Sequence, residues 1–197
     1  DVSEGVVRWS AAYLAEQYPG LQVHAVVGDF DRDLVHVPKG GTRLFAFLGG
    51  TIGNYEPEAR AAMLGRLADA MDPGDSLLLG TDLIKDRDRL ERAYDDAAGV
   101  TAAFDRNLLQ VLVDRLGAEL DLQGWRHRAV WKDEAAWIEM QLVAVGPQRI
   151  AIPALGIDRR FADGEHLHTE TSAKFRRDGI AAELSAAGLA MDRWWTD

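Results

Sequence analysis

The glycine-rich stretch F-L-G-G-T-I-G-N at residues 47–54 contains residue types that could bind a ligand. It follows the apolar residues 44–48, which predict a buried strand, and it precedes Pro57, a residue typical of the first turn of a helix. Glycine lets the backbone turn sharply and approach a ligand closely. Asn54 presents an amide beyond the carboxyl end of the strand, where open α/β sheets bind ligands. Taken alone, the stretch predicts either a ligand-binding loop or a tight turn.

Acidic residues occupy two comparable positions earlier in the chain. Asp1 stands just before a predicted helix, and Asp29 with its apolar neighbour Phe30 follows a strand predicted at residues 21–27. A carboxylate can hold the two hydroxyls of a ribose or accept from an exocyclic amine, and an apolar ring can pack on a purine. Their order along the chain indicates a nucleotide-like cofactor, although each acid taken singly is more typical of a solvated turn.

Helices and strands alternate in the elements that must position these residues. The predicted order is a helix from Ser3 to a break at Pro19-Gly20, strands at 21–27 and 43–48, a helix opened by Pro57 and a strand at 76–83. The leucine-rich last strand is expected to be buried on both faces. This alternation predicts an α/β fold with a parallel, doubly wound sheet. The strand that should lead into Asp1 is absent from the sequence, so the sheet is expected to be incomplete at the N-terminus.

The pattern changes at Lys85. A charged helical segment and a second helix come first, and from Trp125 the apolar period falls toward two. The predicted elements are helices at 85–96, 101–116 and 177–187, antiparallel strands at 125–132, 137–145, 148–152 and 166–174, and a returning strand at 189–195. We therefore predict a core of residues 1–84 and 175–197, interrupted by an inserted α+β domain at residues 85–174.

The composition excludes several classes of protein. The 197 residues carry 32 acidic and 22 basic side chains, and the formal net charge of −10 argues against a nucleic-acid or anionic-membrane surface. Cysteine is absent, which excludes disulfides, thiolate zinc sites and a cysteine nucleophile. No apolar run is long enough to cross a membrane, and the opening residues do not resemble a signal peptide. A cytoplasmic enzyme or binding protein is expected.

A predicted strand near the end of the chain carries residue types that can bind a metal ion. His166, His168 and Glu170 alternate along a predicted strand and are expected to share one face, which could suit a metal ion. No further ligand nearby completes a coordination shell, so no metal is predicted. By themselves, Tyr94 on a charged helix and Met140 in an alternating strand are more typical of packing residues than of a ligand site.

Five runs together carry a family resemblance. They are F-L-G-G-T-I-G-N at 47–54, L-L-L-G-T-D-L-I-K at 77–85, R-A-Y-D-D-A-A-G-V-T-A-A-F at 92–104, residues 138–140 and residues 169–175. With these runs the whole chain resembles the histidine-specific methyltransferases of ergothioneine biosynthesis. The resemblance implies a Rossmann-like class I methyltransferase core, S-adenosylmethionine as methyl donor and an inserted substrate-binding domain. The implied reaction is trimethylation of the α-amine of L-histidine to hercynine, by a protein that is a monomer when complete.

The resemblance also assigns roles residue by residue. Gly49 and Asn54 match the loop at the amino and carboxylate end of histidine, and Tyr94 matches a carboxylate-binding tyrosine. Glu170 and Ser172 match the pair that hydrogen-bonds the imidazole, and residues two apart on a strand point to one face. The other matches are Met140 in the wall of the imidazole pocket, Asp1 at the ribose of the cofactor, and Asp29 and Phe30 at its adenine. No residue is assigned as the acceptor of the amine protons.

The resemblance further implies a chain truncated at both ends. Members of this family place a strand and a glycine-rich loop for the methionine part of the cofactor before the position of Asp1, and they continue beyond Asp197. We therefore expect this chain alone to bind S-adenosylmethionine weakly. Two other functions stay open: a related methyltransferase for another amino acid or amine, and a non-catalytic binding fragment.

Overall fold

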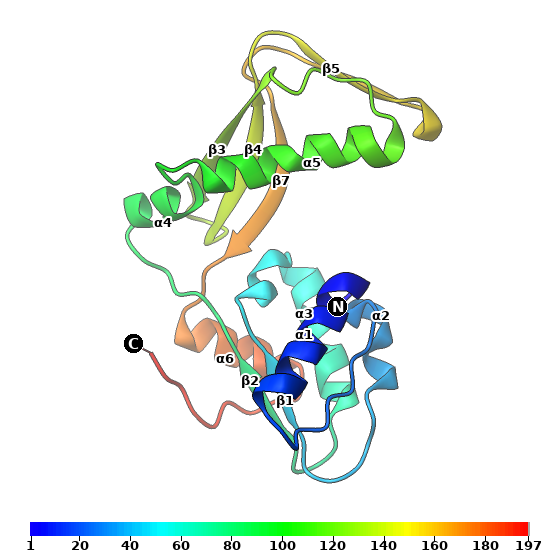
Figure 1. Cartoon of the computed structure of the whole chain (residues 1–197). Coiled ribbons are helices and arrows are strands. Elements are labelled where there is room, and N and C mark those ends of the chain that lie inside the picture. Colours follow the sequence, from blue (N-terminus) through cyan, green and yellow to red (C-terminus); the bar gives the residue numbers. More distant parts are fainter. Residues whose placement is uncertain (197) are drawn as a thin grey trace. The chain divides into compact units, whose positions relative to one another are not determined.

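The computed structural model describes residues 1–196 and contains two compact units. Unit 1 comprises Asp1–Ala46, Ala61–Leu78 and the chain from Ala181 on, and unit 2 comprises Phe47–Arg60 and Leu79–Ile180. Helices and strands occur in both units, so the protein is mixed α/β (Figure 1). Within residues 1–196, no helix has the length and apolar character needed to span a membrane.

Two short strands, β1 (Leu44–Phe47) and β2 (Ser76–Leu79), form a sheet. The N–H of Ser76 donates to the oxygen of Arg43 at 3.0 Å and the N–H of Gly80 to that of Phe47 at 2.9 Å, so both strands advance in the same direction. The predicted parallel pairing is therefore confirmed for this pair. The expectation that the second strand is buried on both faces is wrong, because β2 alternates between exposed and half-buried residues.

The helices of unit 1 largely follow the sequence pattern. The first helix, α1 (Glu4–Gln17), begins after Ser3 as predicted, but Ser3 makes no side-chain cap, and its N–H donates to Asp1 Oδ1 at 2.7 Å. Helix α3 (Pro57–Ala70) opens with the predicted proline. Its buried apolar residues are Met63, Leu64 and Leu67. Two short elements lie between the strands predicted at 21–27 and 43–48. They are α2 (Phe30–Asp33) and the 3-10 helix η1 (Leu34–His36).

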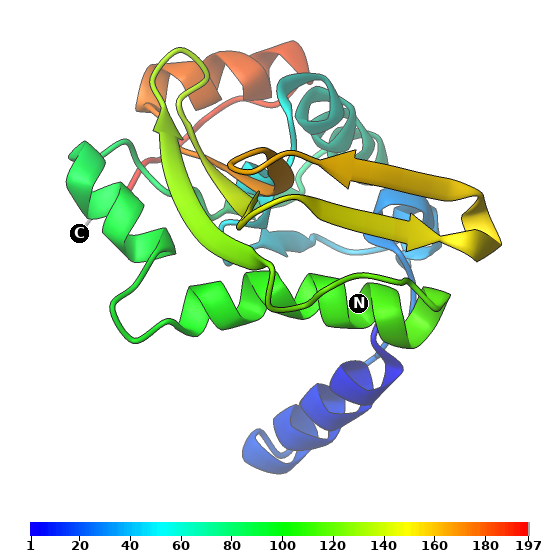
Figure 2. The same ribbon diagram turned by 90° about the horizontal axis from the view of Figure 1, so that it is seen from above.

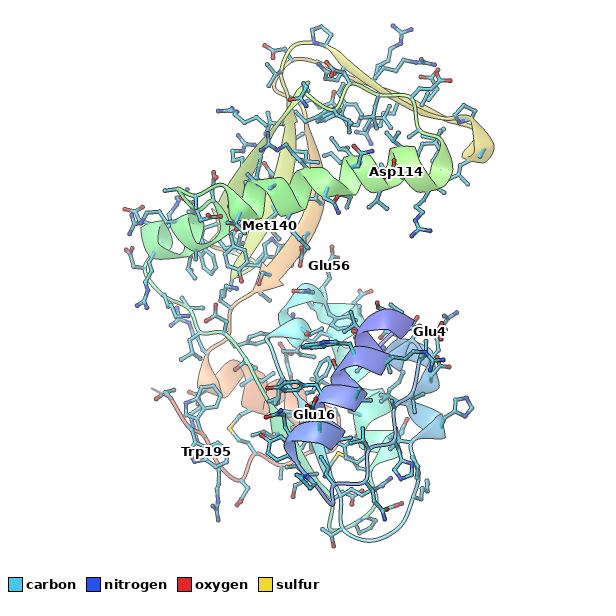
Figure 3. All side chains as sticks on the ribbon, in the orientation of Figure 1. Glu4, Glu16, Glu56, Asp114, Met140 and Trp195 are labelled. Atoms are coloured by element: carbon cyan, nitrogen blue, oxygen red, sulfur yellow. The ribbon has the colours of Figure 1, made fainter. Side chains whose placement is uncertain are left out.

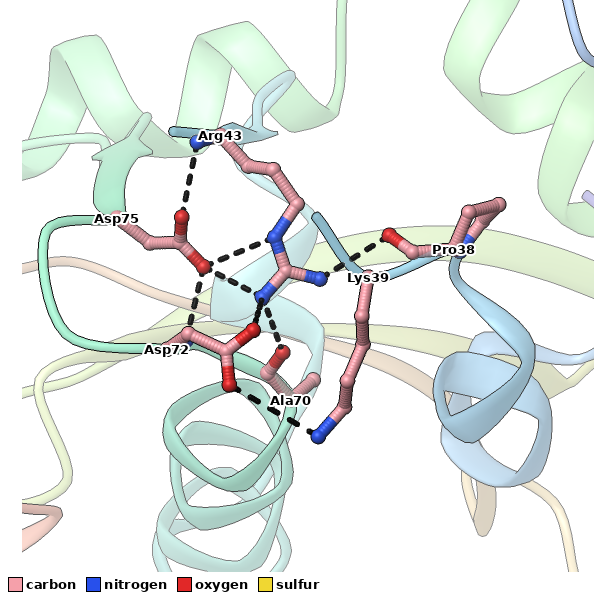
Figure 4. A network of polar contacts seen from close by, with 6 residues as sticks. All are labelled: Pro38, Lys39, Arg43, Ala70, Asp72 and Asp75. Carbon is pink, nitrogen blue, oxygen red and sulfur yellow. Dashed lines mark hydrogen bonds and ion pairs between the residues drawn. The ribbon is translucent and has the colours of Figure 1, made fainter. Parts of the chain in front are cut away.

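Arg43 ties the start of β1 to the turn before β2 (Figure 4). Its backbone N–H and its Nε donate to the two carboxylate oxygens of Asp75 at 2.8 and 2.9 Å, and its Nη2 reaches Asp72 Oδ2 and the oxygen of Ala70, each at 3.0 Å. The Asp75 side chain is 1% exposed. Hydrogen bonds from the Arg43 side chain and the Asp72 N–H lower the pKa of Asp75 from 3.8 to about 2.

Unit 2 is built on an antiparallel sheet with the strand order β3-β4-β7. Its strands, β3 (Trp125–Lys132), β4 (Trp137–Ala144) and β7 (His166–Ala173), agree with the predicted bounds to within one residue. One face packs against Leu90 of helix α4 (Arg87–Tyr94) and Leu109 of helix α5 (Val100–Leu116). Figure 1 and Figure 2 show α5 running along this sheet. The sheet therefore has one helix-covered face, and the period-two pattern of its strands sets which side chains lie there.

A hairpin extends unit 2. Strand β5 (Gln148–Ile152) was predicted, and it pairs antiparallel with β6 (Ile157–Phe161), which was not. The short helix η3 (Pro153–Leu155) joins them. The ring of Phe161 meets Trp125 edge-on, with 5.0 Å between ring centroids, and so fastens the hairpin to the core. The last helix, α6 (Arg177–Ala186), matches its prediction to within one residue.

A bulge in β7 overturns one expectation. Glu170 pairs with Met140, but His168 pairs with the next residue, Gln141, so one residue of β7 is extra. Neighbouring residues of β4 point to opposite faces, and His168 and Glu170 therefore lie on opposite faces rather than on a shared one. His168 Nδ1 is instead 3.5 Å from Glu139 Oε1. No cluster of three potential metal-binding side chains occurs among residues 1–196.

Two predicted strands do not form. Residues 21–27 adopt no sheet structure, and the N–H of Gly28 that follows them donates to the oxygen of Asp1 at 3.1 Å. Residues 189–195 likewise contain no strand. A strand exists only where a second strand pairs with it, and the apolar content of a run does not supply that partner.

Candidate functional site

The loop after β1 owes its shape to glycines. Gly49 and Gly50 have φ angles of 80° and 75°, a left-handed conformation that favours glycine, and they lead into the 3-10 helix η2 (Thr51–Asn54). Gly53 lies against β7, where an added Cβ would be 2.9 Å from the carbonyl oxygen of Ala173. The close approach is therefore made by Gly53 to a strand backbone, while the turn is made by the two preceding glycines.

Asn54 ends this loop and is exposed. Within residues 1–196 its side-chain amide has no hydrogen-bond partner, so it is available to a ligand. Arg60 holds the neighbouring backbone: its Nη1 donates to the oxygen of Tyr55 at 2.9 Å, and its guanidinium lies 5.1 Å from the ring centroid of Phe175. The segment that carries Asn54 is thus fastened to the residues that follow β7.

Four of the predicted site residues come together on the helix-covered face of the sheet. Met140 and Glu170 are cross-strand partners, and Ser172 lies two residues further along β7 with no irregularity between them. Tyr94 at the end of α4 brings its hydroxyl to 2.9 Å from Ser172 Oγ. Met140, labelled in Figure 3, is 4% exposed and belongs to the apolar cluster under α4. The hydrogen bonds of residues 1–196 do not join the loop residues Gly49 and Asn54 to this group.

Glu170 is a partly buried carboxylate without a partner. No hydrogen bond or ion pair within residues 1–196 involves its carboxylate oxygens. Burial raises the pKa of Glu170, and the nearby negative charge of Asp105 adds to the effect. A carboxylate in this environment gains from a ligand that brings a positive charge or an N–H donor.

The structure adds a residue that the sequence did not single out. Lys174 follows β7 with its side chain 0% exposed, and its Nζ lies 2.7 Å from both Tyr94 Oη and Ser172 Oγ. Asp82 Oδ2 lies 3.3 Å from the same Nζ. Lysine is usually a surface residue, so its type gave no signal. Its spacing did, because 170, 172 and 174 share one parity along the strand.

A buried pair holds Tyr94 from the backbone side. His127 on β3 lies 2.7 Å from the oxygen of Tyr94 through Nε2 and 2.7 Å from Asp105 Oδ2 through Nδ1. The two side chains are 1% and 4% exposed. Because the carbonyl oxygen can only accept, Nε2 must carry a hydrogen. The sequence gave no sign of this pair, since its members lie on different elements of unit 2.

The predicted cofactor residues lie in unit 1, where backbone contacts bring them together. The hydrogen bond from Gly28 to Asp1 places Asp1 beside the residue that precedes Asp29. Asp29 caps α2 by accepting from the N–H of Asp31 at 2.9 Å, and Phe30 begins that helix with 37% of its surface exposed. Carboxylates beside an accessible aromatic ring are what ribose hydroxyls and a purine require, so these residues fit the expected cofactor.

Comparisons with known proteins show the family to which this chain is similar. A family model described as "Histidine-specific methyltransferase, SAM-dependent" matches residues 1–197. The chain is 51% identical over 197 residues to the histidine N-alpha-methyltransferase of Mycolicibacterium smegmatis and 50% identical over the same length to that of Mycobacterium tuberculosis. Both alignments cover 100% of this chain and 61% of the relative, so the chain spans about three-fifths of their length. Ergothioneine biosynthesis protein 1 of Neurospora crassa is 25% identical over 186 residues, 91% of this chain and 20% of that protein.

Proposed function

This chain belongs to the histidine-specific, S-adenosylmethionine-dependent methyltransferases, and on that basis we propose that the protein containing it transfers methyl groups from S-adenosylmethionine to the α-amine of L-histidine. The product is the trimethylated betaine hercynine, and the reaction is the first step of ergothioneine biosynthesis. The names of the two mycobacterial relatives support the substrate, and the name of the fungal relative supports the pathway.

The observation that carries the proposal is the group formed by Tyr94, Glu170 and Ser172. It combines a phenol, a carboxylate without a partner in residues 1–196, and a hydroxyl on one face of the sheet. Histidine offers a carboxylate and two ring nitrogens, which are the complementary groups. We assign Tyr94 to the substrate carboxylate, Glu170 and Ser172 to the ring, and Met140 to the wall beside the ring.

The loop residues Gly49 and Asn54 are assigned to the amino and carboxylate end of histidine. An exposed amide without a protein partner can donate to the carboxylate and accept from the amine. Methyl transfer to an amine needs the nucleophile in line with the methyl group more than it needs a covalent catalyst. Orientation by Asn54 and Tyr94 is therefore the main catalytic contribution we assign to this chain, and no residue is assigned to remove the amine protons.

Asp1, Asp29 and Phe30 are the residues that would hold the cofactor. The carboxylates would bind the ribose hydroxyls and the adenine amine, and the ring of Phe30 would pack on the purine. When bound, S-adenosylmethionine supplies a methyl group on a positively charged sulfur, which an unprotonated amine can attack.

The proposal includes an organisation of the chain. Residues 85–174 form a substrate-binding domain inserted into a methyltransferase core of residues 1–84 and 175–197, and β1 and β2 belong to the doubly wound sheet of that core. The active protein is a monomer. The alternation of elements before Lys85 and the antiparallel strands after it support this division.

The test uses the full-length protein that contains this chain, incubated with L-histidine and S-adenosylmethionine and followed by mass spectrometry. We expect mono-, di- and trimethylated histidine in succession. Tyr94→Phe should raise the KM for histidine about tenfold, because it removes a hydrogen bond to a charged group. Tyr18→Phe, at a tyrosine that is 60% exposed, is the matched control and should leave KM unchanged.

Three other outcomes would contradict the proposal. No methylated histidine from the folded full-length protein would reject it. A substrate panel in which tryptophan or tyrosine is preferred over histidine would instead indicate a related methyltransferase for another amino acid. Histidine binding without turnover, even with cofactor present, would indicate a binding module.

A further inference from the structure

Lys174 is a buried charge to which the proposed reaction assigns no role. Its Nζ lies 2.7 Å from Tyr94 Oη, 2.7 Å from Ser172 Oγ and 3.3 Å from Asp82 Oδ2. An ammonium group has three N–H donors and no acceptor, so these three oxygens take all of its hydrogens. Lys174 can therefore influence a ligand only through the groups that it binds.

Asp82 balances the buried ammonium. Its backbone is anchored beside the end of β7. The N–H of Phe175 donates to the backbone carbonyl oxygen of Asp82 at 2.8 Å, and Leu83 forms a parallel bridge with Phe175. Burial pushes the pKa of Asp82 upward, but the hydrogen bond from Lys85 and the charge of Lys174 outweigh it, and the net shift is downward. A fully buried cation is tolerated only with such a partner.

The hydroxyls of Tyr94 and Ser172 have a limited set of hydrogen bonds. Each has one hydrogen and two acceptor positions, and Lys174 fills one acceptor position on each. At a separation of 2.9 Å, one hydroxyl donates to the other. The hydroxyl that accepts has both acceptor positions filled and must donate its own hydrogen outward. The hydroxyl that donates has one acceptor position left and can only accept from outside.

We propose that Lys174 is a positioning residue that gives this pair a fixed direction, with Tyr94 donating to the substrate and Ser172 accepting from it. The proposal rests on the proposed function, because the substrate carboxylate at Tyr94 selects between the two arrangements. A carboxylate can only accept, so Tyr94 directs its hydrogen outward and Ser172 directs its hydrogen to Tyr94. Ser172 then requires an N–H on the ring atom that faces it. The site thus selects a ring with a donor nitrogen at that position over a ring with an acceptor nitrogen.

The test compares substrates that differ in this one property. In the full-length protein, kcat and KM are measured for L-histidine and for the two isomeric thiazolylalanines, whose acceptor-only nitrogen occupies one or the other ring position. Lys174→Met frees an acceptor position on each hydroxyl, so Ser172 can turn and donate. We expect the preference for histidine over one isomer to fall about tenfold, mainly through KM.

Lys132→Met is the matched control, because Lys132 is 43% exposed on β3 and pairs with Glu139. It should leave the preference unchanged. A second variant covers the case in which Lys174→Met does not fold. Ser172→Ala removes the acceptor while keeping Lys174, so it should weaken histidine and spare the same thiazolylalanine isomer, again lowering the preference.

The outcomes separate this proposal from the proposed function. Turnover of histidine by the wild-type protein, together with an unchanged preference in folded Lys174→Met, overturns the role of Lys174 and leaves the methyltransferase assignment standing. In Ser172→Ala, a loss for the isomer whose nitrogen faces Ser172 that equals the loss for histidine would show that Ser172 does not select a donor nitrogen, which also overturns it. If the wild-type protein does not methylate histidine at all, both proposals fail.

Discussion

At the scale of single residues, Glu170 is a partly buried acid whose pKa is shifted upward. Its pKa is raised by burial and then by Asp105, and its carboxylate has no partner within residues 1–196. Binding a ring that carries N–H groups would satisfy this carboxylate. The environment of Glu170 therefore favours the ligand-bound protein over the ligand-free protein.

Glu170→Gln should raise thermal stability and weaken substrate binding together. Because the pKa of Glu170 is higher in the folded chain than in the unfolded one, the wild-type fold loses stability as pH rises through these two values. The neutral amide removes that loss. Melting temperatures at neutral pH and near pH ~4 should show a gain that is largest at neutral pH and vanishes below the ordinary glutamate pKa of about 4.3.

In the same variant the KM for histidine should increase about tenfold, since a charge-assisted hydrogen bond is lost. Glu134→Gln, at an exposed glutamate in the turn between β3 and β4, is the matched control and should change neither quantity. A Glu170→Gln protein that is less stable than wild type at neutral pH would contradict the account of Glu170 given above.

The sequence was informative about this group because chemistry and spacing agreed. Glu170 and Ser172, two apart on a strand, were predicted to share a face, and the register with β4 confirms it. The sequence could not place His168, since a one-residue bulge reverses the faces without any sign in residue type. The residue type of Lys174 gave no sign of its burial, because burial of a lysine depends on partners from distant segments. Only its spacing from Glu170 and Ser172 was informative.

At the scale of elements, β7 organises the helix-covered side of unit 2. The bulge reverses the alternation of faces along the strand, so that Glu170 and Ser172, which follow it, lie on the face that α4 covers. The loop after β1 reaches the end of the same strand through Gly53, whose position allows no Cβ without movement of the Ala173 backbone. The loop and the strand therefore depend on one another for their positions.

Gly53→Ala should destabilise unit 2 and displace the loop that carries Asn54. The added Cβ would stand 2.9 Å from the Ala173 oxygen, a contact that the backbone must relieve. Overpacking of this kind costs about 1–3 kcal/mol. Chemical denaturation gives the stability change, and the KM for histidine should increase because Asn54 moves.

Gly65→Ala is the matched control for this change. Gly65 lies inside α3, and an added Cβ would meet nothing within 4 Å. This variant should be more stable than wild type by about 0.5–1 kcal/mol, since alanine favours the helix. Equal stability changes in the two variants would show that the contact with β7 does not matter.

Elements were predictable from the sequence where their partners are local. Strands β3 and β4 form a hairpin, and turn residues bound them, so pattern and turn signals were sufficient. Strand β6 was missed because Asp158, Arg159 and Arg160 dilute its apolar pattern. Residues 21–27 and 189–195 have strand-like composition, but no pattern within a run can provide the neighbour that would pair with it.

At the scale of the whole molecule, carboxylates that accept hydrogen bonds or pair with cations set the response to low pH. The carboxylates with lowered pKa are Asp75, Asp82, Asp96, Glu139, Asp158 and Glu165. A lowered folded-state pKa means that the unfolded chain binds protons first as pH falls. The stability that these carboxylates contribute is therefore expected to be full above the ordinary carboxylate pKa values and to decline as pH falls below about 4.

Asp75→Asn tests one large source of this acid sensitivity. The Asp75 pKa of about 2 reflects the hydrogen bonds of Arg43, so the variant should be less stable than wild type at neutral pH. The difference should shrink as pH falls from about 4 toward 2, because wild-type Asp75 becomes protonated there. Urea unfolding over this range measures it, with Asp69→Asn on the exposed side of α3 as control. A difference that persists undiminished at low pH would show that the charge of Asp75 is not what matters.

Because Lys174 is buried, its amine can also serve as a chemical probe of local opening of the fold. The chain has four lysines, and the side chains of Lys39, Lys85 and Lys132 are 70%, 35% and 43% exposed, whereas Lys174 is 0% exposed. An amine-acylating reagent should label the first three at once and reach Lys174 only when the end of β7 separates from α4. The labelling rate at this one amine therefore reports how often that region opens, and histidine should slow it if the ligand holds Tyr94 and Ser172 in place.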